Sequence, residues 1–130
     1  TLLFSMNDLF EGAVAVLLRR ALAGRGIEVL EQGGLRYCLG EWVQDRECQG
    51  SVFQTRPDII LRKGGKVLAV IDTKWKHLSP DPLDRKAGVS QADVYQLMGY
   101  ARIYRCQRLM LLFPCSPGEP SGEIRRFGIH

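Results

Sequence analysis

Three charged residues flank two apolar runs in the middle of the chain. Residues 56–76 read RPDIILRKGGKVLAVIDTKWK, so Asp58 precedes the first run, while Asp72 and Lys74 follow the second. Side chains alternate between the faces of a β-strand, and Asp72 and Lys74 therefore point the same way. A charge at the end of so apolar a strand is costly unless it is paired or binds a metal. This pattern predicts a metal-dependent phosphodiesterase site.

The oxygen ligands of such a site indicate which metal it would take. Two aspartates that converge on one oxygen-rich site favour Mg²⁺ or Mn²⁺ over zinc. We expect Asp58, Asp72 and the backbone carbonyl of Thr73 to be ligands, with the Thr73 side chain in the core. The metal would polarise the phosphate, and Lys74 would orient or deprotonate the attacking water. The structural alternatives are an exposed turn at Asp58, an ion pair of Asp72 with Lys74 or Arg56, and a surface position for Lys74.

The turn between the two runs decides whether the aspartates meet. If residues 64–66 form a three-residue loop, Asp58 lies opposite Asp72, and directly opposed residues share a face of the sheet. A two-residue loop of Gly64 and Gly65 would place the aspartates on opposite faces, because a slip of one residue reverses every side chain. We therefore predict an odd-length turn or an equivalent bulge.

Two predicted helices bring further candidates. Glu11 lies on the apolar face of the first helix, where its carboxylate either points inward to the metal or stays in solvent. The second helix places Asp93, Gln96 and Tyr100 on one face, and the last two, four residues apart, could brace a metal ligand or contact a phosphate. Asp93 has an alternative role, because Ser90-x-x-Asp93 fits a capping box.

Apolar periodicity and turn residues divide the whole chain into elements. The elements predicted are helices at 5–24 and 90–104, strands at 27–31 and 35–39 around a hairpin signal at 32–34, strands at 58–62, 67–74 and 108–113, an edge strand at 123–128, and loops at 41–50 and 77–89. Apolar residues on both faces of the central strands indicate a sheet covered on both sides. This order predicts an α/β fold with a mixed central β-sheet flanked by helices.

Composition bounds the class of protein. The chain has 130 residues, one domain's worth, with a net charge of +4, which suits a nucleic-acid partner without establishing one. No apolar run approaches the roughly 20 residues of a membrane span. The four cysteines form no C-x-x-C pair and the two histidines are scattered, so we do not expect a zinc site. The same cysteine pattern leads us to expect a reducing, cytoplasmic location. Because the chain begins at Thr1 and not at Met, we expect a domain of a longer protein.

Taken together, the motifs resemble the PD-(D/E)xK nuclease superfamily, in particular its members with a Q-x-x-x-Y helix. Within it they are similar to the McrC-type nuclease subunits of McrBC modification-dependent restriction systems. The resemblance runs from about residue 6 to residue 114, and it rests on MNDLFE at 6–11, RPDI at 56–59, DTKWK at 72–76 and DVYQL at 93–97.

The resemblance implies a restriction-endonuclease-like core across residues 1–130 and Mg²⁺-dependent cleavage of DNA. It also implies a GTP-driven AAA+ partner of the McrB type, which recognises methylated DNA. McrC-like proteins engage that partner through a region before the nuclease domain, so the resemblance implies that this chain is the C-terminal part of a longer protein and cuts poorly alone. In the pattern of the family, metal binding falls to Asp58, Asp72, Thr73 through its carbonyl, and Glu11 directly or through water. Catalysis falls to Lys74 together with these acidic residues, and a supporting role falls to Asp93, Gln96 and Tyr100. The rival interpretations are a RecB-type or recombination-type exonuclease, and a non-catalytic DNA-binding or assembly module with a relict site.

Overall fold

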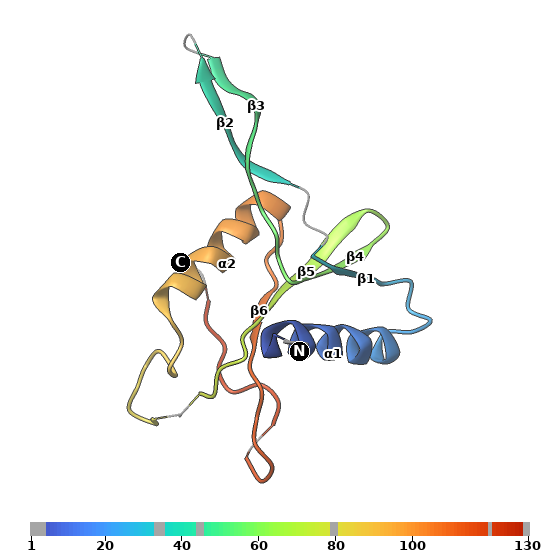
Figure 1. Ribbon diagram of the computed structural model, residues 1–130, viewed down its shortest axis with the longest axis vertical. Helices are drawn as coiled ribbons and strands as arrows, with labels where there is room; N and C mark the ends of the chain where they lie inside the picture. The colour runs from blue at the N-terminus through green and yellow to red at the C-terminus, as the bar shows by residue number, and fades with distance from the viewer. Residues whose placement is uncertain (1–4, 33–35, 44–45, 79–80, 120, 129–130) are drawn as a thin grey trace, which may run out of the picture.

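A mixed four-stranded sheet lies between two helices, and a two-stranded arm projects from this body (Figure 1). The computed structural model describes residues 5–32, 36–43, 46–78, 81–119 and 121–128. Along the chain its elements are α1 (Met6–Ala21), β1 (Glu28–Glu31), β2 (Tyr37–Val43), β3 (Arg46–Gln54), β4 (Ile59–Lys63), β5 (Lys66–Thr73), α2 (Gln91–Tyr104) and β6 (Leu109–Leu112). The prediction of an α/β fold with a mixed central sheet flanked by helices is confirmed.

The sheet has the strand order β1-β4-β5-β6, with antiparallel pairs except for the parallel pair of β5 and β6. Alternate residues of β4 and β5 enter two separate cores. Ile60 and Val70 pack with residues of α2, whereas Ile59 and Ile71 pack with Ala15 of α1. The central strands are therefore buried on both faces, as their continuous apolar runs predict.

The β4–β5 hairpin reaches the predicted register by a different route. Its turn has two residues, Gly64 and Gly65, both with positive φ, and Lys63 pairs with Lys66. A bulge follows, because the ladder passes from the Arg62–Val67 pair to the Leu61–Ala69 pair and leaves Leu68 over. The prediction of a three-residue loop is therefore wrong, and the alternative prediction of a bulge is confirmed. The ladder ends with the Ile59–Ile71 pair, the last pair before Asp58 and Asp72.

Both helices begin near the predicted residues. Ser5 caps α1 by accepting a hydrogen bond from the Asp8 N–H (3.4 Å), and the helix ends three residues earlier than predicted, at Ala21. Ser90 is the N-cap of α2, but its side chain makes no capping hydrogen bond. The capping box is therefore wrong, since the carboxylate of Asp93 is drawn instead to the ammonium of Lys74.

The pairing predicted for the first strands is also wrong. Strand β1 pairs with β4, thirty residues away, and not with its neighbour β2. Strands β2 and β3 pair with each other and form the arm, so the described residues of the predicted loop, 41–43 and 46–50, are β-structure. The turn signal at residues 33–34 lies outside the described residues. Polar sequence did not prevent an antiparallel ribbon here because an exposed ribbon does not require an apolar face.

The remaining differences lie after α2. Strand β6 is shorter than predicted, and residues 123–128 are irregular and exposed, because no strand of the described sheet pairs with them. The predicted loop after β5 is present in its described parts, 77–78 and 81–89. Within the described part of the chain, neither helix is long and apolar enough to cross a membrane.

Candidate active site

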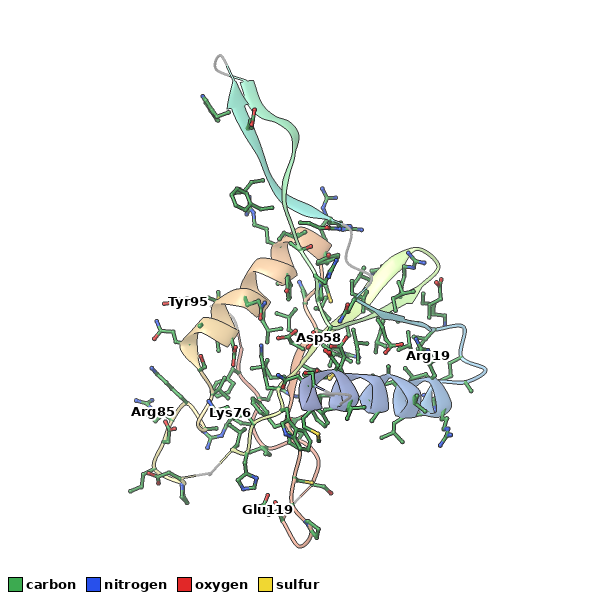
Figure 2. All side chains as sticks on the ribbon, viewed as in Figure 1. Arg19, Asp58, Lys76, Arg85, Tyr95 and Glu119 are labelled. Carbon is green, nitrogen blue, oxygen red and sulfur yellow. The ribbon has the colours of Figure 1, made fainter. Side chains whose placement is uncertain are left out.

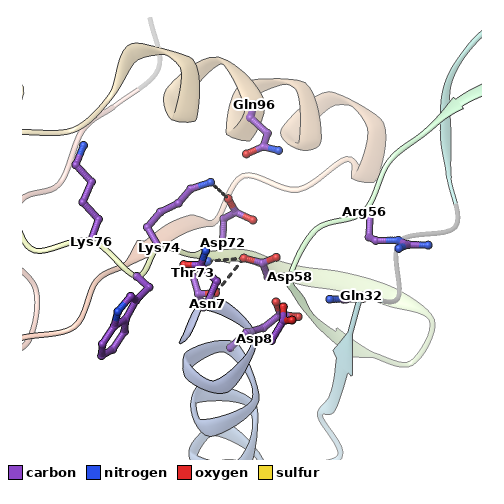
Figure 3. Close-up of a pocket in the computed structure, with 12 residues that line it drawn as sticks. Asn7, Asp8, Gln32, Arg56, Asp58, Asp72, Thr73, Lys74, Lys76 and Gln96 are labelled. Atoms are coloured by element: carbon purple, nitrogen blue, oxygen red, sulfur yellow. Dashed lines mark hydrogen bonds and ion pairs between the residues drawn. The ribbon is translucent and has the colours of Figure 1, made fainter. Parts of the chain in front are cut away.

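A pocket of about 380 Å³ opens where β5 ends, between the beginning of α1 and the side of α2. Figure 2 places Asp58 near the centre of the molecule, between the two helices, and Figure 3 shows the pocket in detail. The residues that line it come from five segments: Asn7, Asp8 and Glu11; Gln32; Arg56 and Asp58; Asp72, Thr73, Lys74, Trp75 and Lys76; and Gln96.

Asp58 is held by the last residue of β5. Its Oδ2 accepts hydrogen bonds from the backbone N–H of Thr73 (2.8 Å) and from the Thr73 hydroxyl (3.0 Å). The Thr73 side chain is buried, as expected, but it is turned towards the site rather than away from it. The alternation of side chains between the two faces of the sheet does not hold here, because Asp58 lies just before β4 and Thr73 is the last residue of β5. Two donors thus fix one oxygen of the carboxylate that faces the pocket.

Asp72 and Lys74 form the centre of a chain of charges. The Lys74 ammonium lies 2.8 Å from Asp72 Oδ2 and 3.3 Å from Asp93 Oδ1 of α2. Burial lowers the pKa of Lys74, but its bonds to Asp72 and Asp93 outweigh burial and raise the pKa above the usual 10.5. Burial also raises the pKa of Asp72; Lys74 opposes this shift and the charge of Asp58 adds to it. Lys74 is therefore a positively charged donor at neutral pH.

Glu11 is buried in the pocket, with 7% of its surface exposed. Burial is the main reason that its pKa rises from 4.5 to about 7, and the neighbouring charge of Asp58 raises it further, while a hydrogen bond with Gln32 opposes the rise. Desolvation and a like charge both disfavour the ionised carboxyl group. The structure thus brings the first-helix carboxylate next to Asp58, on the inward side of α1.

Helix α2 contributes Gln96 to the pocket and Tyr100 behind it. Gln96 Nε2 donates a hydrogen bond to the Tyr100 hydroxyl (3.1 Å). Tyr100 is 6% exposed, and burial, together with the charges of Asp72 and Asp58, raises its pKa to about 12. The Tyr100 phenol therefore stays protonated and holds the Gln96 amide in place. Gln96 lines the pocket, whereas Tyr100 does not.

The donor set suits a hard divalent cation. Glu11, Asp58 and Asp72 offer carboxylate oxygens, the ligands that Mg²⁺ prefers. Like-charge repulsion contributes to the raised pKa values of Glu11 and Asp72, and a cation among them would relieve it. Across the described residues, however, no three Asp, Glu, His or Cys side chains stand ready as a preformed metal site. The metal ligands, including the Thr73 carbonyl, remain a prediction.

Six residues of the pocket were not among the predicted site residues: Asn7, Asp8, Gln32, Arg56, Trp75 and Lys76. Asn7 and Asp8 lie one helical turn before Glu11, a spacing that could have revealed them. Gln32 could not have been found, because it arrives through the pairing of β1 with β4. Its backbone has φ 46°, and its N–H donates to the Asp58 carbonyl (2.8 Å).

Trp75, beside the pocket, packs its ring against Phe10 of α1 with 5.5 Å between the ring centroids. The indole is nevertheless 46% exposed. Trp75 therefore joins the end of β5 to the beginning of α1, and this contact helps to place Glu11, one residue after Phe10, against the strand end.

Comparisons with known proteins agree with this picture. The family model for a McrBC 5-methylcytosine restriction system component matches residues 1–114. No curated protein matches the chain. Among solved structures, a refined half-complex from the tetradecameric assembly of Thermococcus gammatolerans McrB AAA+ hexamers with bound McrC has the same fold, with a TM-score of 0.60 and 22% identity. The match covers 92% of this chain but 23% of that one. Because the family model extends over most of its length, the chain belongs to the family of McrBC 5-methylcytosine restriction system components.

Proposed function

We propose that this chain is the nuclease region of a McrC-like subunit and that it hydrolyses DNA phosphodiester bonds with Mg²⁺. One observation carries the proposal: Glu11, Asp58, Asp72 and Lys74, from two distant parts of the sequence, line one pocket. Glu11 and Asp72 are buried, and Asp58 and Lys74 are partly buried. Such a set has little value for stability, because the carboxylates repel one another. Such a set is well suited to holding a cation beside a phosphate.

The acidic residues would bind the metal. Asp58 and Asp72 would be ligands, with the Thr73 carbonyl and Glu11, directly or through water, completing the set. When bound, Mg²⁺ would supply Lewis-acid polarisation of the phosphate and a more acidic water. The hydrogen bonds from Thr73 to one oxygen of Asp58 keep that carboxylate in place before any ligand arrives.

Lys74 and Gln96 would act on the phosphate itself. In the reaction, water attacks phosphorus, the bond to the 3′ oxygen breaks, and that oxygen leaves with a proton; the resemblance implies 5′-phosphate and 3′-hydroxyl ends. Lys74 is protonated, so it donates hydrogen bonds to the phosphate oxygens as negative charge grows on them, rather than acting as the base. Gln96, fixed by Tyr100, is placed to orient the water or a phosphate oxygen.

The partner in this proposal is a McrB-like AAA+ GTPase that selects methylated DNA. Two findings support it: the family match, and the likeness to a structure that contains McrB AAA+ hexamers with bound McrC. The chain spans 23% of the matched chain, so the proposal is tested with the full-length protein.

The test is DNA cleavage by the full-length protein with its AAA+ partner, GTP and Mg²⁺. Asp72→Asn should abolish cleavage while DNA affinity changes little, because the variant removes a metal ligand and keeps the shape of the side chain. Asp81→Asn, in an exposed loop outside the pocket, is the matched control and should cut normally.

Other outcomes would favour the rivals. Cleavage that survives Asp72→Asn would refute the mechanism. Cutting of DNA ends without the GTPase would favour an exonuclease. DNA binding by the wild-type protein without any cleavage, and without Mn²⁺ between Asp58 and Asp72 in anomalous scattering, would favour a relict module.

A further inference from the structure

Two cations on the rim of the pocket have no partner within the described part of the chain. Arg56 and Lys76 line the same pocket as four carboxylates, yet neither side chain makes a hydrogen bond or an ion pair with any described residue. Both residues are exposed. Lys74, by contrast, is bound to Asp72 and Asp93 at once. Its charge is largely compensated, whereas the charges of Arg56 and Lys76 are available to a ligand.

The two cations lie on opposite sides of the carboxylates. Figure 3 shows Arg56 on one side of Asp58 and Asp72 and Lys76 on the other. The reason is topological, because Arg56 leads into β4 two residues before Asp58, and Lys76 leaves β5 two residues after Lys74. The segment that carries Arg56 and the segment that carries Lys76 separate beyond the paired ends of β4 and β5. The carboxylates of Asp58 and Asp72 therefore lie between these two cations.

A nucleic-acid strand needs such an arrangement. The carboxylates of Asp8, Glu11, Asp58 and Asp72 repel phosphates unless a metal neutralises them, so the flanking phosphates need cations that are not already paired. A guanidinium can bind two phosphate oxygens at once, and an ammonium acts as a compact point charge. Such contacts fix the register of the strand without reading its sequence.

We infer that the cleaved DNA strand crosses the pocket from Arg56 to Lys76, so that these residues bind the phosphates on the two sides of the scissile phosphate. This inference rests on the proposed nuclease function and adds to it the path of the strand and two substrate-binding residues.

The experiment measures how DNA affinity depends on salt. The full-length protein, carrying Asp72→Asn to prevent cleavage, is titrated with one oligonucleotide between low and moderate ionic strength. Each lost phosphate contact should reduce the slope of log K against log salt by about 0.7 for single-stranded DNA and about 0.9 for duplex DNA. We expect this loss for Arg56→Ala and for Lys76→Ala. Arg56→Lys should keep the slope and weaken binding, because it keeps the charge and loses the two-oxygen geometry.

The controls are Lys63→Ala and Lys66→Ala, which remove the same charge from exposed positions at the turn of the β4–β5 hairpin, outside the pocket. Unchanged slopes in the rim variants, equal losses in the controls, or no DNA binding at all would overturn the inference. The nuclease function is tested separately by cleavage with unsubstituted Asp72. Slope losses confined to the rim variants, with no cleavage by the wild type, would support the strand path and refute the nuclease.

Discussion

Lys74 carries its charge because two carboxylates from different elements share it. Asp72 belongs to the same strand, whereas Asp93 reaches it from the first turn of α2. An exposed lysine would lose most of this attraction to solvent, but Lys74 is half-buried and keeps it. The contact with Asp93 replaces the predicted capping box of α2 and also holds the ammonium of Lys74 at the pocket.

Glu11 should make the metal-free protein sensitive to pH. Its pKa rises from 4.5 to about 7 on folding, so its contribution to stability is full below pH 4.5 and is lost as the pH rises through 7. The loss is at most about 3.5 kcal/mol, because one pKa unit corresponds to about 1.4 kcal/mol. Glu11→Gln should flatten this part of the stability curve and stabilise the protein at pH 8. Thermal unfolding in EDTA between pH 4 and pH 8 measures both effects.

Glu41→Gln, on the exposed strand β2, is the control and should keep the wild-type pH dependence. If the Glu11→Gln protein keeps that slope as well, the buried carboxyl group is not its cause. Mg²⁺ added at pH 8 should stabilise the wild type, since a cation offsets the repulsion between Glu11 and Asp58.

At the scale of elements, one hydroxyl joins the arm to the body. Thr55 Oγ1 donates to the Arg36 carbonyl (2.6 Å) and shares a hydrogen bond with the Tyr104 hydroxyl (2.5 Å), while the Arg36 side chain covers the Tyr104 ring and donates to the Ile103 carbonyl. These contacts connect the base of the β2–β3 arm to the end of α2, the helix that carries Gln96 and Asp93.

Thr55→Val should therefore destabilise the fold by about 1–3 kcal/mol, because it leaves the buried Tyr104 hydroxyl without its partner. Tyr104→Phe removes the same bond from the other side and serves as the second arm of a double-mutant cycle. Urea denaturation gives the free energy of unfolding of the two single variants and of the double variant. The double variant should lose less of this free energy than the two single variants lose in sum. Additive costs would show that the hydroxyls do not stabilise each other.

The sequence predicts elements better than their partners. The apolar runs locate β4, β5 and both helices. If Asp58 and Asp72 are to share a face, the number of residues between them requires either an odd-length turn or a bulge, and the structure has the bulge. That number cannot say that Leu68 is the residue left over, because several positions give the same register. Strand β1 pairs with β4 through a backbone ladder and an ion pair between Glu28 and Arg62. The glycines that follow β1 predict a turn, but they do not indicate which strand β1 pairs with.

The same limit applies to the candidate site. Asp58, Asp72 and Lys74 follow from one hairpin, and Gln96 with Tyr100 follows from helical spacing, so local pattern places them. Contacts between distant segments do not follow from the local sequence pattern. Asp93 meets Lys74 only because α2 crosses the end of β5, and Gln32 reaches the pocket only through the β1–β4 pair.

At the scale of the whole molecule, the pocket lies where the layers meet. One core packs α2 on the sheet and the other packs α1 on its opposite face, and Glu11 and Gln96 reach the end of β5 from these two sides. Carboxylates are thus held together by a core that does not depend on them, although their mutual repulsion opposes folding. If the proposed metal binds here, the protein should be strained without it and relieved by it.

Asp58→Asn tests this balance directly. The amide oxygen can still accept the hydrogen bonds of Thr73, while the charge that raises the pKa values of Glu11 and Asp72 is gone. We expect the metal-free variant to be at least as stable as the wild type. The wild type should gain about 2.7 kcal/mol when Mg²⁺ is present at one hundred times its Kd, and the variant should lose most of that gain. Thermal unfolding with and without Mg²⁺ gives all four values, and Asp81→Asn should respond to Mg²⁺ as the wild type does. A metal-free variant that is clearly less stable, with an undiminished response to Mg²⁺, would mean that Asp58 is a structural residue and that any cation binds elsewhere.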